Sequence, residues 1–202
     1  MDVVLVDAGG TNIGSVSYAL QRLGVRAEMT ADPARIRAAS HVILPGVGAA
    51  VQGMQRLRDS GLDRLIPTLT QPVLGVCLGM QLLFAHSEEG EVDCLGILPG
   101  TVRKLAGGAG LRVPHMGWNG LAKVRDDALL DGVNDGERAY FVHGYAAPVG
   151  ADTVATSTHG EAFSAIVRHG NFCGMQFHPE RSAALGARLL GNFLQLSPAT
   201  SA

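Results

Sequence analysis

The segment Pro72–Gln81, with the sequence PVLGVCLGMQ, constrains the fold of this chain more than any other stretch. Its apolar residues 73–76 are typical of a short buried strand, and good helix formers follow from Leu78 to Ala85. Cys77 stands at the junction and has a glycine two residues away on each side. A strand, a sharp turn and a helix with a reactive side chain at the turn predict a nucleophile elbow, with cysteine in place of serine.

Such an elbow would expose the sulfur at a helix N-terminus, where unpaired N–H groups favour a thiolate. The flanking glycines fit a turn too tight to accommodate a Cβ atom. The alternative is a small buried cysteine in a core strand, as most free cysteines are. The elbow alone leaves the two interpretations evenly balanced.

A second cluster, Gln176–Glu180, tips this balance. His178 and Glu180 are two residues apart, so on an extended segment they project to the same side, and Pro179 stiffens the backbone between them. A carboxylate beside an imidazole sets its tautomer and stabilises the imidazolium. A polar turn before the last helix is the alternative, but elbow and pair together supply nucleophile, base and orienting group.

The first part of the chain predicts an open parallel sheet with helices on both faces, because strand and helix patterns alternate. The expected strands are 3–6, 25–29, 41–44 and 73–76, and the expected helices are 13–23, a short one capped by Asp32 and Pro33, 49–58 and 62–69. Ligands of such sheets bind at the carboxyl ends of the strands. Both Cys77 and the loop Pro45–Gly48 fall there.

The second part predicts short strands that extend the sheet in a mixed or antiparallel manner, followed by a closing helix over 182–195 with Ser182 as its N-cap. These strands are 101–105, 139–143, 153–157, 165–168 and 172–175. No linker or repeat interrupts the 202 residues, so we expect one α/β domain, 1–202.

Two glycine-rich turns follow predicted strands. In Pro45–Gly48 the glycines would let backbone N–H groups face a ligand, so this loop is either an ordinary turn or one arm of an oxyanion hole. The turn Ala8–Asn12 does not fit G-x-G-x-x-G, and a plain tight turn is favoured over a phosphate site.

Composition excludes several classes of function. A formal charge of −2 without basic runs argues against nucleic acid or an anionic membrane as partner. Three cysteines without C-x-x-C spacing fit a reducing compartment better than disulfides or a metal site. Without a signal peptide or an apolar run of ~20 residues, we expect a soluble, cytoplasmic protein without metal or cofactor.

The motifs now support a resemblance. Segment 75–81 resembles the nucleophile motif of class I glutamine amidotransferases, 178–180 their second catalytic motif, and 45–48 their oxyanion loop. Within that class, segments 7–12, 114–119 and 140–145 resemble the glutaminase subunits of imidazole glycerol phosphate synthases, in histidine biosynthesis. The resemblance spans nearly the whole chain.

The resemblance implies that Cys77 attacks the side-chain amide of L-glutamine, and that His178, held by Glu180, protonates the departing ammonia. A glutamyl thioester is then hydrolysed to glutamate. The ammonia passes to a barrel-shaped cyclase subunit in a heterodimer, which forms imidazole glycerol phosphate and an aminoimidazole-carboxamide ribonucleotide.

The resemblance also assigns roles to further residues. The N–H groups of Leu78 and Val47 would form the oxyanion hole, and Gly46, Gly48, Gln81, Gly144 and Tyr145 would bind glutamine. The residues that would face the cyclase are Asn12, Trp118, Asn119, Tyr140 and Arg181. His115 and His143 are expected to be polar wall or interface residues. Arg181 and Gly144 depart from the family pattern, which commonly has lysine and a small hydroxyl residue there.

Three other functions remain open from the sequence. A class I glutaminase serving a different synthase is the main alternative. A catalytically silent scaffold for a cyclase is disfavoured by the intact Cys77, His178 and Glu180. A stand-alone cysteine hydrolase is disfavoured by the separate His-Pro-Glu motif.

Overall fold

The computed structural model of the protein describes residues 1–7, 13–108 and 110–198. Within this part an eight-stranded sheet runs in the order β2-β1-β3-β4-β14-β13-β12-β9. The pairs from β2 to β14 are parallel and the remaining pairs are antiparallel, which confirms the predicted mixed sheet. Its strands are β1 Val3–Val6, β2 Ala27–Thr30, β3 His41–Gly46, β4 Val73–Cys77, β9 Ala122–Lys123, β12 Thr153–His159, β13 Glu161–His169 and β14 Phe172–Met175.

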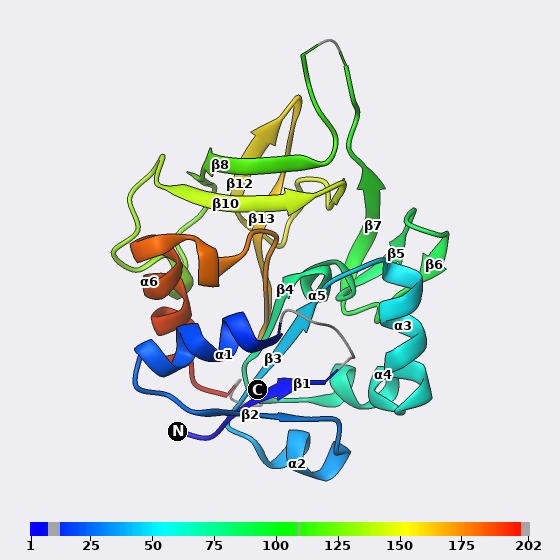
Figure 1. Cartoon of the computed structure of the whole chain (residues 1–202), viewed down its shortest axis with the longest axis vertical. Helices are drawn as coiled ribbons and strands as arrows, with labels where there is room; N and C mark the ends of the chain where they lie inside the picture. Colours follow the sequence, from blue (N-terminus) through cyan, green and yellow to red (C-terminus); the bar gives the residue numbers. More distant parts are fainter. Residues whose placement is uncertain (8–12, 109, 199–202) are drawn as a thin grey trace.

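Helices cover both faces of this sheet, with α1 and α6 on one side and α3 and α4 on the other (Figure 1). The helices are α1 Ile13–Arg22, α2 Pro33–Ala38, α3 Ala50–Asp59, α4 Leu62–Leu65, α5 Leu78–Gln81 and α6 Ala183–Leu194, with 3-10 turns η1 Ile66–Thr68, η2 Ala128–Leu130 and η3 Pro179–Arg181. No helix of the described segments is long and apolar enough to cross a membrane.

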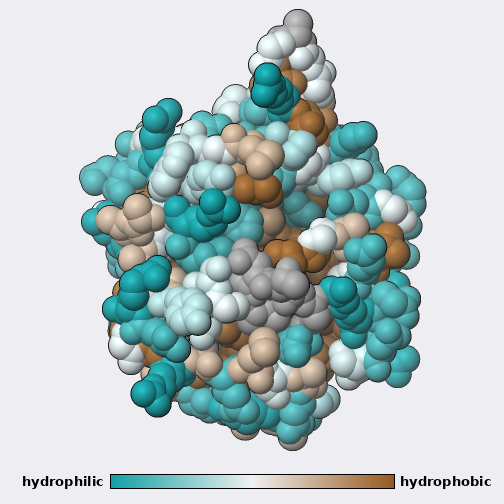
Figure 2. Space-filling view, viewed as in Figure 1, coloured by the Kyte–Doolittle hydropathy of each residue, from teal (hydrophilic) through white to brown (hydrophobic). Residues whose placement is uncertain are grey.

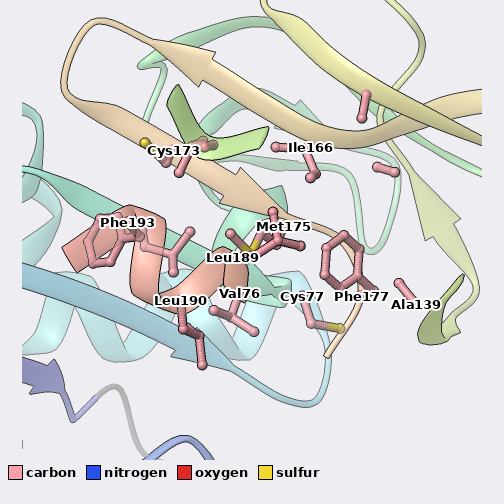
Figure 3. Close-up of a cluster of buried hydrophobic side chains, with 14 of the residues drawn as sticks. Val76, Cys77, Ala139, Ile166, Cys173, Met175, Phe177, Leu189, Leu190 and Phe193 are labelled. Atoms are coloured by element: carbon pink, nitrogen blue, oxygen red, sulfur yellow. The ribbon is translucent and has the colours of Figure 1, made fainter. Parts of the chain in front are cut away.

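The first strand shows why the sheet is buried on both faces. Val3 and Leu5 point into the core beneath α1 and α6, whereas Val4 and Val6 point into the core beneath α2, α3 and α4. Figure 3 shows the first core, where Leu189, Leu190 and Phe193 of α6 lie against sheet residues such as Val76 and Met175. On the surface in Figure 2, hydrophilic residues cover most of the rim of the molecule.

Part of the second half departs from the prediction. Segments 101–105 and 139–143 are strands, but they belong to two smaller sheets and do not extend the main one. These sheets have the orders β10-β8 and β11-β7-β5-β6, and β8 and β10 cross above the main sheet in Figure 1. Their strands are β5 Phe84–Ser87, β6 Val92–Asp93, β7 Leu98–Lys104, β8 His115–Gly120, β10 Arg138–His143 and β11 Tyr145–Ala146.

The helix expected over 78–85 is also wrong in length. It ends at Gln81, and the chain re-enters a strand at Phe84. The carbonyl of Leu83 accepts hydrogen bonds from the N–H groups of both Ile97 and Leu98, at 2.9 Å each. Pairing with this distant segment therefore overrides the local helix preference.

The two predicted helix caps differ in outcome. The Asp32 carboxylate accepts a hydrogen bond from Ala34 N at 2.9 Å, with Pro33 in the first turn, as predicted. Ser182 stands at the cap position of α6 but makes no side-chain cap bond. Its hydroxyl instead donates to the His178 carbonyl at 2.7 Å and accepts from Tyr140 N at 2.9 Å.

Three glycines let β3, β4 and α5 approach with no side chain between them. A Cβ at Gly79 would collide with the Leu44 carbonyl oxygen, and a Cβ at Gly46 would lie 2.6 Å from Gly79 N. A Cβ at Gly75 would lie 2.6 Å from Met80 N. The elbow is therefore built by direct contact between backbones.

Gly79→Ala is expected to destabilise the fold by at least about 2 kcal/mol, because the new methyl group meets rigid backbone. Chemical denaturation measures the change. Gly191→Ala is the matched control, since a Cβ added there on α6 would meet no neighbouring atom within 4 Å. The control should be neutral or slightly stabilising, and equal effects at the two positions would contradict the packing argument.

Candidate active site

Cys77 ends β4 in a strained backbone conformation. Its φ of 53° and ψ of −111° lie outside the regions that side-chain-bearing residues prefer, at a cost of about 1 to 3 kcal/mol. The residue is 9% exposed and belongs to the same buried cluster as Phe177 (Figure 3). Strand, strained turn and one-turn helix form the predicted elbow, which here rests on the glycine contacts and not on a long helix.

Parallel register brings two other segments to the sulfur. Gly46 at the end of β3 pairs with Cys77, which places the Pro45–Gly48 loop beside the elbow. On the other side, Met175 of β14 pairs with Val76, so Gln176 and the residues after it leave the sheet at the same end.

The His178–Glu180 pair forms as predicted. His178 Nδ1 and Glu180 Oε1 are 2.9 Å apart, and the two side chains are 10% and 2% exposed. His178 N donates to the Tyr140 carbonyl at 2.9 Å, which ties this segment to β10. The second oxygen of Glu180 is buried without a hydrogen-bond partner among the described residues, so the carboxylate is directed at the imidazole alone.

Electrostatics keep His178 protonated. Burial disfavours its charge and is the largest single effect, but interactions with the Cys77 sulfur and the Glu180 carboxylate outweigh it and raise the pKa of His178 to about 10. A positive imidazolium beside a cysteine sulfur favours the thiolate. The arrangement is that of a nucleophile with an adjacent acid and an orienting carboxylate.

A cavity of about 300 Å³ opens at the sulfur. It is lined by all residues predicted to form the oxyanion hole or bind glutamine: Gly46, Val47, Gly48, Leu78, Gln81, Gly144 and Tyr145. Sequence reasoning missed Glu89 and Val142 in its lining. Val142 lies in the segment 140–145, which the resemblance singles out, whereas Glu89 lies in an irregular stretch without a sequence pattern.

Two buried glutamines form a hydrogen-bonded row that ends at the sulfur. Gln81 Nε2 donates to the Tyr145 carbonyl at 2.9 Å and to Gln176 Oε1 at 3.0 Å. Gln176 Nε2 in turn lies 3.9 Å from Cys77 Sγ as a donor. Both amide hydrogens of Gln81 are therefore used, and its carbonyl oxygen is the group that can accept a hydrogen bond from a ligand. Gln176 is a further residue to which the sequence assigned no role.

The predicted interface residues fall into three groups. Trp118 and Tyr140 are in edge contact with ring centroids 5.8 Å apart, and the Arg181 guanidinium lies 4.3 Å from the Tyr140 ring centre. Asn119 is half-buried, and its amide donates to the Thr158 carbonyl at 2.7 Å. Asn12 lies outside the described residues.

His115 and His143, the other two histidines considered in the sequence analysis, lie in different places. His143 lines the cavity, as a polar wall residue would, whereas His115 lies behind it and is 5% exposed. Among the described residues no cluster of three or more His, Cys, Asp or Glu could hold a metal ion.

The charge on His178 predicts a pH dependence of stability. Because its folded-state pKa of about 10 lies above the ordinary 6.5, its contribution is fully present below pH 6.5 and is lost as the pH rises towards 10. Between pH 6.5 and 10, the melting temperature of the wild type should therefore fall more than that of His178→Gln. Parallel loss in both proteins would show that other groups cause it.

Comparison with known proteins agrees with this geometry. A family model described as glutamine amidotransferase class-I matches residues 4–196. The imidazole glycerol phosphate synthase subunit HisH of Xanthomonas axonopodis pv. citri is 60% identical over 97% of this chain and 98% of its own length. The subunit of the same name from Xylella fastidiosa (strain Temecula1) is 54% identical over 98% of this chain and 99% of its own.

Solved structures share the fold at lower identity. A putative GMP synthase protein from Thermoplasma acidophilum superposes with a TM-score of 0.74 at 20% identity, over 96% of this chain and 92% of that one. A structure described as a glutamine amidotransferase gives 0.73 at 20% identity, over 96% and 98%. With the family model matching from residue 4 to 196, the chain belongs to the class I glutamine amidotransferases.

Proposed function

We propose that this chain is the glutaminase subunit of an imidazole glycerol phosphate synthase, acting at Cys77 and delivering ammonia to a cyclase subunit. The observation that carries the chemistry is the convergence of the Cys77 sulfur, the His178–Glu180 pair and a cavity at one end of the sheet. Relatives at 54% and 60% identity bear the name of that synthase subunit, which supports the choice of reaction partner.

In the proposed reaction, the Cys77 thiolate bonds to the side-chain carbonyl carbon of glutamine, and the carbon–nitrogen bond breaks. His178 gives its proton to the leaving nitrogen, which departs as ammonia. The neutral imidazole then takes a proton from water, which attacks the thioester and releases glutamate and the thiolate. Glu180 holds His178 Nδ1, so that Nε2 is the nitrogen that exchanges the proton.

The negative oxygen formed during attack would be bound by the N–H groups of Leu78 and Val47. Leu78 follows the nucleophile directly, and Val47 lies on the loop that β3 brings beside it. One such donor contributes ~3 kcal/mol to lowering the barrier. In the cavity lining, Glu89 Oε2 accepts from Ala50 N at 2.9 Å, and the remaining acceptor capacity of this carboxylate would bind the ammonium group of an amino-acid substrate.

The proposed partner surface is formed by β8 and β10. Met116 and Trp118 on β8 are 64% and 48% exposed, and the Tyr140–Arg181 contact continues this surface towards the His178 segment. Aromatic and arginine side chains of this kind are the usual anchors of protein interfaces. We propose a heterodimer with the cyclase in the cytoplasm, where the three free cysteines would stay reduced.

Other functions fit less well. Service to a different synthase has no specific support, because the structural neighbour named after GMP synthase is only 20% identical and shows the fold alone. A silent scaffold would have no need for a protonated His178 beside a strained cysteine.

Cys77→Ala is expected to abolish product formation from glutamine by the complex with the cyclase, while turnover with added ammonia persists. The reason is that only ammonia release needs the thiolate. Steady-state assays with each nitrogen source measure both activities. Loss of both would mean that Cys77 supports the assembly itself.

Trp118→Ala is expected to weaken binding of the cyclase on the order of tenfold, since it removes an exposed anchor. Titration calorimetry with the purified subunits measures the affinity. Met29→Ala is the matched control, because Met29 is 55% exposed on the edge strand β2, which lies at the opposite end of the molecule from β8 and β10 in Figure 1. Equal affinities of the two variants would place the interface elsewhere.

A further inference from the structure

A chain of buried polar groups lies behind the cavity wall. His115 Nδ1 is 3.0 Å from His143 Nε2, and His143 Nδ1 is 2.8 Å from the Tyr145 carbonyl oxygen. At the outer end, Asn119 Nδ2 is 3.4 Å from His115 Nε2. The two imidazoles are 5% and 6% exposed, so the bond between them is formed away from solvent.

The backbone carbonyl of Tyr145 determines the direction of every bond in this chain. A carbonyl can only accept, so His143 Nδ1 carries the hydrogen. In a neutral ring His143 Nε2 is then an acceptor, and His115 Nδ1 must donate to it. His115 Nε2 is left as an acceptor for the Asn119 amide, which also donates to the Thr158 carbonyl.

The surroundings of the two rings favour the neutral form. Burial is the largest of the causes that lower the pKa of both His115 and His143 to about 4. The neighbouring His159 contributes to both shifts, and His115 and His178 contribute to that of His143 against the opposing effect of its bond to the Tyr145 carbonyl. His159 stacks on His115 with ring centres 4.2 Å apart. The rings of Phe141 and Phe163 pack against His115 and also against His143.

The same carbonyl begins a second branch that leads to the nucleophile. Tyr145 O also accepts from Gln81 Nε2, which obliges Gln176 to present its oxygen to Gln81. The amide nitrogen of Gln176 must then face Cys77 Sγ, as observed at 3.9 Å. The Tyr145 carbonyl thus joins the histidine pair to the glutamines around the sulfur.

We propose that His115 and His143 are positioning residues for glutamine hydrolysis: together they hold the Tyr145 carbonyl, and through it orient Gln81 towards the substrate and Gln176 towards the sulfur. The inference rests on the proposed function for its reaction, but not for its geometry. Gly144, which separates His143 from Tyr145, has no side chain to anchor this wall, so the His143 bond takes that role.

Kinetics of the complex with the cyclase test the proposal. His115→Leu removes the donor and is expected to lower kcat/KM for glutamine roughly ten- to a hundredfold through misplacement of the pocket, with ammonia-dependent turnover unchanged. His115→Asn keeps an N–H near the position of Nδ1 and should restore most of the loss.

His41→Leu is the matched control. His41 is also 5% exposed and bonds to the Leu196 carbonyl at 3.1 Å, but it lies at the start of β3, at the opposite end from Gly46. Equal kinetic losses in His41→Leu and His115→Leu, or no rescue by His115→Asn, would reduce His115 to a purely structural residue and overturn the proposal.

Nitrogen-15 spectra of the histidine rings give a readout independent of the substrate. At neutral pH, His115 and His143 should both be neutral and carry hydrogen on Nδ1, whereas His178 should be protonated on both nitrogens. Hydrogen on Nε2 of His143, or a charged His143, would overturn the proposal. Absence of glutaminase activity with these tautomers present would instead contradict the proposed function and leave the hydrogen-bond geometry intact.

Discussion

Direct backbone contact between β3, β4 and α5 is the constraint on which the site depends. Gly46, Gly75 and Gly79 leave no room for side chains there, and this closeness holds Cys77 in its positive-φ conformation. Because β3 and β14 flank β4 in parallel register, the Pro45–Gly48 loop and the His178 segment emerge beside the same sulfur. The chemistry is thus assembled by sheet topology from three segments that are distant in sequence.

Electrostatically, the site separates two pairs of polar groups. His178 is paired with Glu180 and the sulfur, and it stays charged although it is buried. His115 and His143 face each other and aromatic rings, and burial keeps both neutral. Burial therefore accompanies opposite charge states at one site: negative partners hold His178 as a cation, whereas the His115–His143 pair offers only fixed hydrogen bonds.

Local patterns predicted the features that depend on neighbours in sequence: the elbow at Cys77, the stiff His178–Glu180 segment, and the β-strands buried on both faces. Predictions were wrong where pairing with distant segments determines the structure. Phe84 begins a strand and does not continue the helix, because the Leu83 carbonyl bonds to residues 97 and 98. Strand β8 pairs with β10 in a separate sheet, although its sequence has no alternation of apolar and polar residues that predicts a strand. Roles that arise from hydrogen bonds between remote side chains, as for Gln176 and His115, cannot be read from the local sequence, because the partner residues lie far away in the chain.

The Tyr145 carbonyl has one more consequence, for how this site can vary. Two hydrogen-bonded branches take their polarity from a main-chain oxygen, and no substitution can turn that oxygen into a donor. Substitutions can remove or replace the side chains of either branch, but they cannot reverse the order of donors and acceptors. The polarity of the pocket is therefore inherited with the backbone trace itself.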